Sequence, residues 1–238
     1  MQLYDDVYSQ IKQLLPVEAS VRSPYRSDMC APEGEKDRIL FGSETAYELG
    51  GGGRQSASAV LFADIPEKQS ETLLFGPDLD EISRDQPFGH VSVVRLKDGS
   101  GAQYSSETLK TIGFTVFRLY PEGYHIRISP VSCKEQVRVA SSAIKKDRPL
   151  SFINVGNSLI REFLKHPEVE YAKTLFITDR DFDYRSLSAA ALKVKKITDA
   201  VQSAMQLDEL DCASCRMKPI CDEIDGLRDM HLRKEGKI

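Results

Sequence analysis

The longest periodic stretch of the chain runs from about residue 184 to residue 207. Within it, apolar residues recur every three or four positions and form one stripe of Leu187, Ala191, Val194, Ile197, Val201, Ala204 and Met205. This spacing predicts a long amphipathic helix, which must bury its apolar face against another element. Residues 172–178, shortly before it, have the composition of a buried strand. The end of the chain therefore indicates a sheet with a long helix packed on it.

The rest of the chain shows strand patterns first and then alternating helix and strand patterns. Strands are predicted at residues 58–63, 72–75, 91–96 and 124–129, and helices at residues 3–15, 105–120, 134–144 and 157–164. Residues 16–37 are polar, contain Pro24, Pro32 and Gly34, and are predicted to form a loop. This order of elements predicts an α+β or α/β fold, in which a mixed sheet carries packed helices.

Four consecutive glycines, at positions 50–53, precede Arg54. Glycine lets backbone N–H groups approach a phosphate closely. However, the Lys-Ser/Thr ending of a P-loop and the spacing of a dinucleotide-binding fingerprint are both missing. We therefore expect a surface turn between two strands.

Length and composition argue against several classes of protein. The chain has 238 residues, of which 41% are hydrophobic and 29% charged, as is typical of a globular protein. A formal net charge of -4 argues against a general nucleic-acid binder. No apolar run approaches the roughly 18 residues needed to span a membrane, and the N-terminal residues lack the basic start and apolar core of a signal peptide. These features predict a cytoplasmic protein that binds neither nucleic acid nor membrane.

Three of the five cysteines lie close together near the end of the chain. Cys212, Cys215 and Cys221 form the pattern C-x2-C-x5-C between two helical patterns. Thiolates in this arrangement select a [4Fe–4S] cluster or zinc, although buried thiols or a redox pair remain the alternative. We expect a mixed-sheet domain at residues 1–206 and a metal-binding helix–Cys-loop–helix appendage at residues 207–238.

Three thiolates leave a fourth coordination position open. Cys30 is the first candidate for it, because the long polar loop around it could reach back to the other cysteines. His231, Asp211 and Asp222 are further candidates. The position could also be exchangeable and hold water, a substrate or a residue of a partner.

A second group of candidate site residues is basic. His125 and Arg127 alternate along a predicted strand and therefore share one of its faces. Together with Arg118 and Arg54, they could bind an anionic group such as a coenzyme A phosphate. The alternative is an exposed strand face with scattered charge.

Two further polar features depend on the predicted helices. The run Asp179, Arg180 and Asp181 follows a buried strand, where ligands often bind in sheet proteins, but here it is expected to cap the long helix. Cys133 follows Ser132, the predicted N-cap of the helix at 134–144, where the helix dipole would lower the thiol pKa. Alternatively, Cys133 is a small buried apolar residue. No Ser-His-Asp order, paired-carboxylate site or HExxH pattern stands out.

Five stretches, in their order along the chain, resemble a known family. They are FGSETAYEL (41–49), LLFGPDLDEI (73–82), HVSVVRLKDG (90–99), YPEGYHIRIS (120–129) and KTLFITDRDF (173–182). They resemble the middle region of the β subunit of the carbon monoxide dehydrogenase/acetyl-CoA synthase complex, with Cys212 and Cys215 where that family begins its cluster-binding cysteines. The resemblance covers roughly residues 38–221.

The resemblance implies the sheet domain of that family. It also implies iron–sulfur ligation by Cys212 and Cys215, with Cys221 as a looser match. The family has a longer N-terminal region, completes its cluster with downstream cysteines and binds nickel through a Cys-x-Cys pair. This chain has no cysteine after Cys221. Nickel and carbonylation chemistry are therefore not carried over.

Three functional hypotheses follow. The first is an iron–sulfur protein of anaerobic one-carbon metabolism, serving in electron transfer, in assembly or in small-molecule binding. It would work with a redox or one-carbon enzyme, or by self-association. The second is a zinc-stapled binding or regulatory subunit without redox chemistry. The third is a carbonyl- or acyl-transferring enzyme that a partner completes.

Overall fold

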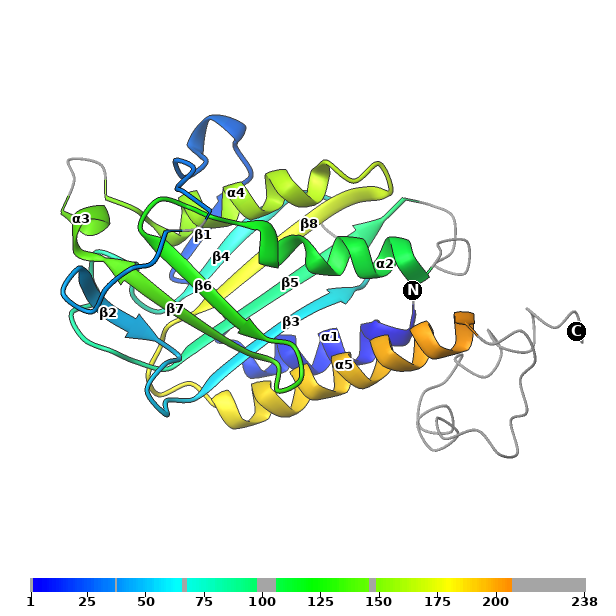
Figure 1. Cartoon of the computed structure of the whole chain (residues 1–238). Coiled ribbons are helices and arrows are strands. Elements are labelled where there is room, and N and C mark those ends of the chain that lie inside the picture. Colours follow the sequence, from blue (N-terminus) through cyan, green and yellow to red (C-terminus); the bar gives the residue numbers. More distant parts are fainter. Residues whose placement is uncertain (1, 37, 66–67, 98–105, 146–148, 207–238) are drawn as a thin grey trace, which may run out of the picture.

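The computed structural model describes residues 2–36, 38–65, 68–97, 106–145 and 149–206, and its elements form two sheets (Figure 1). The large sheet has the strand order β1 (Val21–Pro24), β4 (Glu71–Phe75), β8 (Val169–Ile177), β5 (Phe88–Leu96) and β3 (Ser56–Phe62). Along this order the pairs alternate between antiparallel and parallel. The small sheet, β2 (Thr45–Leu49), β7 (Lys134–Ala140) and β6 (Tyr124–Ser129), is antiparallel. The predicted α+β class, a mixed sheet with packed helices, is confirmed for these residues.

Helices cover both faces of the large sheet. A side chain added at Gly156 of α4 (Phe152–Leu164) would collide with Thr72, whereas one added at Gly89 of β5 would collide with Leu187 of α5 (Tyr184–Gln206). The register places Thr72 on the face opposite Gly89, because alternate residues of a strand point to opposite sides. Hence α4 and α5 lie on opposite faces. Helix α1 (Gln2–Leu14) packs beside α5, as Figure 1 shows.

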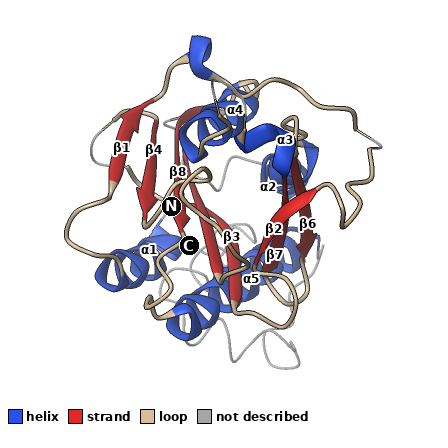
Figure 2. Ribbon diagram, turned by 90° about the vertical axis from the view of Figure 1, so that its left-hand side faces the viewer, coloured by secondary structure: helices blue, strands red, loops and turns tan. Residues whose placement is uncertain are grey.

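The small sheet stands on the α4 side of the large sheet, with the short α3 (Ser141–Ile144) and α2 (Ser106–Gly113) nearby (Figure 2). Aromatic rings fill the space between the layers. The centre of the Phe152 ring of α4 lies 4.7 Å from that of the Phe176 ring, and the centre of the His90 ring lies 5.0 Å from that of Phe176. This inner layer positions the residues that join the two sheets.

The long helix forms as its apolar stripe predicts. Leu187, Ala191, Val194, Ile197 and Val201 are all buried. Its N-terminus differs from the prediction, however, because the Asp183 carboxylate accepts the Ser186 N–H at 3.0 Å and supplies the cap. Asp179 instead accepts the N–H of Asp181 in the preceding turn.

The predicted helix at 134–144 is wrong. Residues Lys134–Ala140 form strand β7, which pairs with β2 on one side and β6 on the other. Their burial alternates, with Glu135, Val137 and Val139 inward and the residues between them exposed. Only the four residues of α3 are helical in this segment. The apolar residues of the segment fit both the helical spacing and the alternating spacing of a strand. Pairing with a strand on each side stabilises the strand.

Other element boundaries also shift. The predicted loop at 16–37 contains β1 and the one-turn 3-10 helix η1 (Ser27–Met29). The predicted helix at 105–120 becomes α2 followed by the 3-10 helix η3 (Phe114–Arg118). Helix α4 begins before the predicted residue 157, where the Ser151 hydroxyl accepts the Asn154 N–H at 3.2 Å. The glycine turn lies between β2 and β3 as expected, with Gly50 at φ +65.

None of the helices in the described part of the chain is both long enough and apolar enough to cross a membrane.

Candidate functional site

A groove with charged walls lies where the loop after η1 meets α4 and the connection from η3 to β6. The Gly34 N–H donates to the Tyr120 carbonyl at 2.7 Å, and the Glu122 N–H donates to the Pro32 carbonyl at 2.9 Å. Together with the bridge between Glu33 and Pro121, these bonds hold two distant chain segments side by side. A side chain at Gly34 would crowd the Glu122 backbone at 3.0 Å, so the small residue permits the close approach.

Helix α4 fixes the other wall of this groove. The Ala31 N–H is shared between the Ser158 hydroxyl at 2.9 Å and the Asn154 carbonyl at 3.1 Å. The Asn154 side chain also donates to the Met29 carbonyl at 2.8 Å. The loop that carries Lys36 is therefore tied to the helix that carries Arg161 and that ends just before Lys165.

The groove consists of two adjoining cavities. The first has a volume of about 340 Å³, and the second has a volume of about 480 Å³. They share Glu33, Gly34, Lys36, Tyr120 and Pro121 as lining residues. We call the two together the charged groove.

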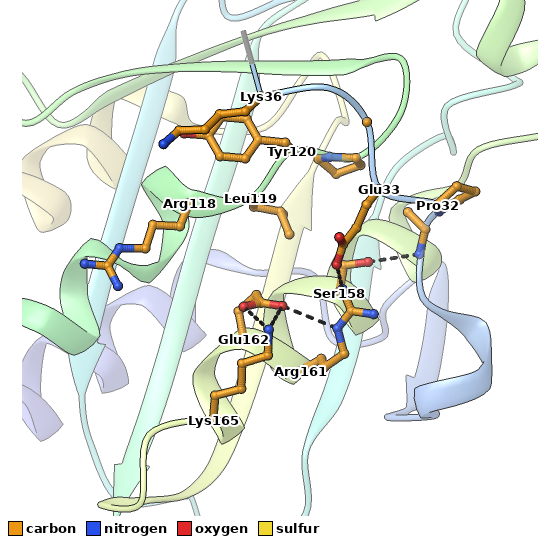
Figure 3. Close-up of a pocket in the computed structure, with 13 residues that line it drawn as sticks. Pro32, Glu33, Lys36, Arg118, Leu119, Tyr120, Ser158, Arg161, Glu162 and Lys165 are labelled. Atoms are coloured by element: carbon orange, nitrogen blue, oxygen red, sulfur yellow. Dashed lines mark hydrogen bonds and ion pairs between the residues drawn. The ribbon is translucent and has the colours of Figure 1, made fainter. Parts of the chain in front are cut away.

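The first cavity carries more basic than acidic groups. Its charged residues are Lys36, Arg118, Arg161, Lys165, Glu33 and Glu162. Figure 3 shows that both carboxylates are engaged, Glu33 with Arg161 at 2.9 Å and Glu162 with Lys165 at 2.6 Å. Lys36 and Arg118 form no ion pair with any described residue, and both are exposed. The first cavity therefore offers two cations without an ion-pair partner to an anionic ligand, whereas the second cavity is also lined by the carboxylates of Glu35 and Glu122.

The second cavity contains His125 of β6. Burial lowers the pKa of His125 below its ordinary 6.5, and the positive charge of Arg38 lowers it further. The imidazole is therefore neutral at pH 7. It can donate or accept a hydrogen bond there, but it adds no charge.

The pKa of His125 gives a testable prediction. An NMR titration should place this pKa below 6.5, and Arg38→Ala should raise it toward that value. A lowered folded-state pKa means that the stability contribution of His125 is present above pH 6.5 and is lost as the pH falls through the folded value. A measured pKa at or above 6.5 would show that the imidazole is not desolvated in the groove.

The structure brings together two of the four basic candidates. Arg118 and His125 line adjoining parts of the charged groove. Arg127 is exposed on β6 and lines neither cavity. Arg54 lies in the glycine turn, where it pairs with Asp85 at 3.2 Å and donates to the Gly51 carbonyl. Arg54 and Arg127 thus lie outside the charged groove, and anion binding by any of the four residues stays a prediction.

The metal-ligand candidates Cys212, Cys215 and Cys221 lie outside the described residues, as do Asp211, Asp222 and His231. Cys30 is described and is half-buried at the end of η1, next to Ala31 of the charged groove. Within the described ranges, no three His, Cys, Asp or Glu side chains cluster in a way that could hold a metal ion. Ligation by the three C-terminal cysteines and by Cys30 stays a prediction.

Cys133 does not begin a helix. It precedes strand β7 with φ 50 and is buried. Burial raises the pKa of the Cys133 thiol. The expectation of a thiol activated by a helix dipole is therefore wrong, and the alternative of a small buried residue is confirmed.

A buried polar network, which sequence patterns did not indicate, lies between the two sheets. The Glu135 carboxylate of β7 accepts the Ser58 hydroxyl of β3 at 2.8 Å, and the same carboxylate oxygen lies 2.8 Å from His90 Nδ1. His90 Nε2 in turn lies 3.1 Å from the Ser92 hydroxyl. The order Glu135–His90–Ser92 matches that of a nucleophilic triad. Because Ser92 is fully buried and lines neither cavity of the groove, the network joins the sheets instead.

Comparison with known proteins identifies a distant relative of the chain. The chain matches no model of a protein family. It is 26% identical over 195 residues to the acetyl-CoA decarbonylase/synthase complex subunit beta of Archaeoglobus fulgidus. The match covers 78% of this chain and 36% of that protein, so the chain spans about a third of the length of the relative. The resemblance to this family is confirmed, at the level of a distant and partial relative.

Proposed function

We propose that this protein acts in one-carbon metabolism as an iron–sulfur protein related to the β subunit of the acetyl-CoA decarbonylase/synthase complex. It would hold a [4Fe–4S] cluster through Cys212, Cys215 and Cys221 and bind a phosphate-bearing anion in the charged groove. The observation that carries the proposal is the similarity over 195 residues to that subunit. The cysteine spacing and the two cations of the first cavity, Lys36 and Arg118, support it.

The C-terminal cysteines suit an iron–sulfur cluster better than a structural zinc ion. Structural zinc is almost always bound by four protein ligands, and this segment offers three thiolates. Three thiolates leave one iron of a [4Fe–4S] cluster open for Cys30, for water or for a small ligand. The cluster would then serve in electron transfer, in assembly or in binding at the open iron.

The proposed ligation of the cluster by three cysteines predicts what happens when one of them is replaced. Cys215→Ser should lose the iron and increase hydrogen exchange in residues 208–238, because metal binding supplies the local folding free energy. The large sheet should keep its protection. Cys133→Ser is the matched control, and it should retain the iron. Iron content that is unchanged by Cys215→Ser would exclude this residue as a ligand, and global loss of protection would contradict the proposed boundary near residue 206.

The charged groove suits a ligand with phosphate groups, of which coenzyme A is one. Arg118 supplies a planar fork of donors that can bind phosphate in a bidentate manner, and Lys36 supplies a point charge. Tyr120, about one-third exposed at 37%, offers a ring face beside Lys36 on which a base can stack (Figure 3). Arg161, which is paired with Glu33, and Lys165, which is paired with Glu162, also line this cavity.

The groove makes a second prediction, with adenosine 3′,5′-bisphosphate as the probe. Arg118→Ala should weaken its binding, measured by calorimetry, by roughly tenfold or more, since a hydrogen bond to a charged group is worth about 1.5–3 kcal/mol. Arg54→Ala removes an arginine outside the groove and should leave the Kd unchanged. Equal losses for both variants would indicate a general charge effect, and no binding by the unmodified chain would remove the groove from the proposal.

Partner association is part of the proposed function. The relative is named as a subunit of a complex. We expect this chain to associate with a redox or one-carbon enzyme, or with itself, in the cytoplasm.

A further inference from the structure

We propose that the outer edge of strand β3 is a docking site for an extended peptide segment of another protein, which adds to the large sheet as one more strand. This proposal is independent of the charged groove and of the cysteines. It concerns an apolar cleft formed by β3, α2 with η3, the turn between β6 and β7, and α5. The cleft has a volume of about 240 Å³, and we call it the β3 cleft.

The first step concerns the hydrogen bonds of β3, which is the outermost strand of its sheet. Its odd-numbered residues pair with β5, since the Phe88 N–H donates to the Gln55 carbonyl and the Ala63 N–H donates to the Val94 carbonyl. Alternate residues of a parallel strand point their backbone groups to opposite edges. The backbone groups of Ser58, Val60 and Phe62 therefore point away from the sheet.

The second step follows that outer edge residue by residue. At its start, the Ser56 carbonyl accepts the Ser188 hydroxyl at 3.3 Å, and the Ser58 N–H donates to the Cys133 carbonyl at 2.8 Å. Beyond its end, the N–H of Asp64 donates to a carboxylate of α1 at 3.2 Å. Both ends of the edge are thus closed by other elements.

Between these ends the edge is open. No described residue outside the sheet bonds to the N–H or C=O of Val60, or to the N–H of Phe62. Such backbone groups normally have partners, and a free edge is a template for an added strand. The open stretch is the part of β3 that lines the β3 cleft. Val60, which stands at its centre, is only half-buried.

The third step concerns the walls of the cleft. Apolar side chains line both sides of the open edge, among them Leu109, Phe114, Phe117, Ile128 and Val194. Phe114 is 40% exposed although it is large and apolar. A strand on this edge would place every second side chain among these residues, which selects for valine, isoleucine, leucine or phenylalanine.

The rim of the cleft adds a charge preference. Lys110 forms no ion pair with any described residue, and its ammonium group stands 5.9 Å from the centre of the Phe114 ring. Lys195, on the opposite wall, is already paired with Asp199. An acidic residue next to the apolar ones would therefore complement Lys110. The open backbone edge favours an extended peptide over an apolar small molecule as the ligand. A peptide can hydrogen-bond to the N–H and C=O of Val60, whereas an apolar molecule would leave both without partners.

The test uses the full chain and a capped peptide of alternating valine and threonine with a glutamate at each end. NMR should show shifts at Val60, Phe62 and Phe114 on titration, and slower exchange of the Val60 N–H. Two control peptides carry N-methyl groups on alternate amides. If a strand is added, only one of the two methylation patterns should bind, because the other blocks the edge that faces β3.

Gly113→Gln is the protein variant for this test. Gly113 lines the cleft with φ -61, and a side chain there meets nothing within 4 Å, so the variant should fold normally and obstruct the cleft. Gly42→Gln is the matched control, because Gly42 is equally uncrowded and lies outside the cleft. We expect Gly113→Gln to weaken peptide binding at least tenfold and Gly42→Gln to leave it unchanged.

Several results would overturn the proposal. Equal binding of both methylated peptides would mean that side chains alone attract the peptide. Absence of shifts at millimolar peptide would show that the edge does not accept a strand. Slow exchange of the Val60 N–H in the free protein would mean that the edge is already covered. If that protection depends on protein concentration, a second copy covers it; otherwise the chain itself does.

Discussion

Replacement of Glu135 by alanine should lower the free energy of unfolding by about 3–5 kcal/mol, because it removes the centre of a buried polar network. The carboxylate is 1% exposed and accepts hydrogen bonds from two sides, from Ser58 and from His90. These three residues come from β7, β3 and β5, so the network holds the small sheet against the large one. After the substitution the hydroxyl and the imidazole stay buried without their partner.

Urea unfolding of the variant set measures this effect. Glu135→Gln keeps the volume and one acceptor oxygen and should cost less than Glu135→Ala. Gln136→Ala changes the next residue of the same strand, which is exposed, and should cost within about 0.5 kcal/mol of zero. A loss below about 1 kcal/mol for Glu135→Ala would show that this side-chain network contributes little to holding the two sheets together.

Glu71→Ala should be similarly destabilising, by about 3–5 kcal/mol, because it removes the buried carboxylate that pairs with the buried Lys173 ammonium. Glu71 and Lys173 are direct partners in the register of β4 and β8, and their charged atoms lie 2.7 Å apart. Their side chains are 0% and 2% exposed. Arg22 also reaches Glu71, at 3.1 Å, but its side chain is 58% exposed and contributes less.

The double variant Glu71→Leu with Lys173→Met separates charge from packing. Both new side chains are apolar and of similar volume, so the desolvation cost of the ions disappears along with their attraction. We expect the double variant to be more stable than Glu71→Ala and close to the unmodified protein in thermal unfolding. If the double variant is clearly less stable than the unmodified protein, the pair is a net source of stability.

Elements with strong local patterns could be predicted from the sequence. The stripe from Leu187 to Val201 is long enough that only a helix fits it, and α5 forms as expected. The segment at 134–144 is short, and its apolar residues suit a strand as well as a helix. It pairs with the nearby β6, but its other partner, β2, lies about ninety residues earlier, so part of the pairing that decides its structure is not a local property.

The charged groove could be predicted only in part, for the same reason. His125 and Arg118 belong to one local stretch and were recognised as anion-site candidates. Lys36 joins them only because the loop before it pairs with residues 120–122, a contact between distant parts of the chain. Arg54 fits the composition of an anion site, but its turn pairs it with Asp85.

The buried network was missed because its members are dispersed. Ser58, His90 and Glu135 come from three strands, and no local spacing in the sequence links them. A polar residue at an inward position of a strand was the available signal. It becomes informative only after the inward face of β7 is known, and the wrong helix prediction concealed that face.

The most direct test of the proposed function is the iron and acid-labile sulfide content of the full chain, purified and reconstituted without oxygen. We expect about four iron atoms and four sulfides per chain, as a [4Fe–4S] cluster requires. One zinc per chain without sulfide would instead make the protein a zinc-stapled binding subunit. A colourless chain with neither iron nor zinc would contradict metal binding by Cys212, Cys215 and Cys221 altogether.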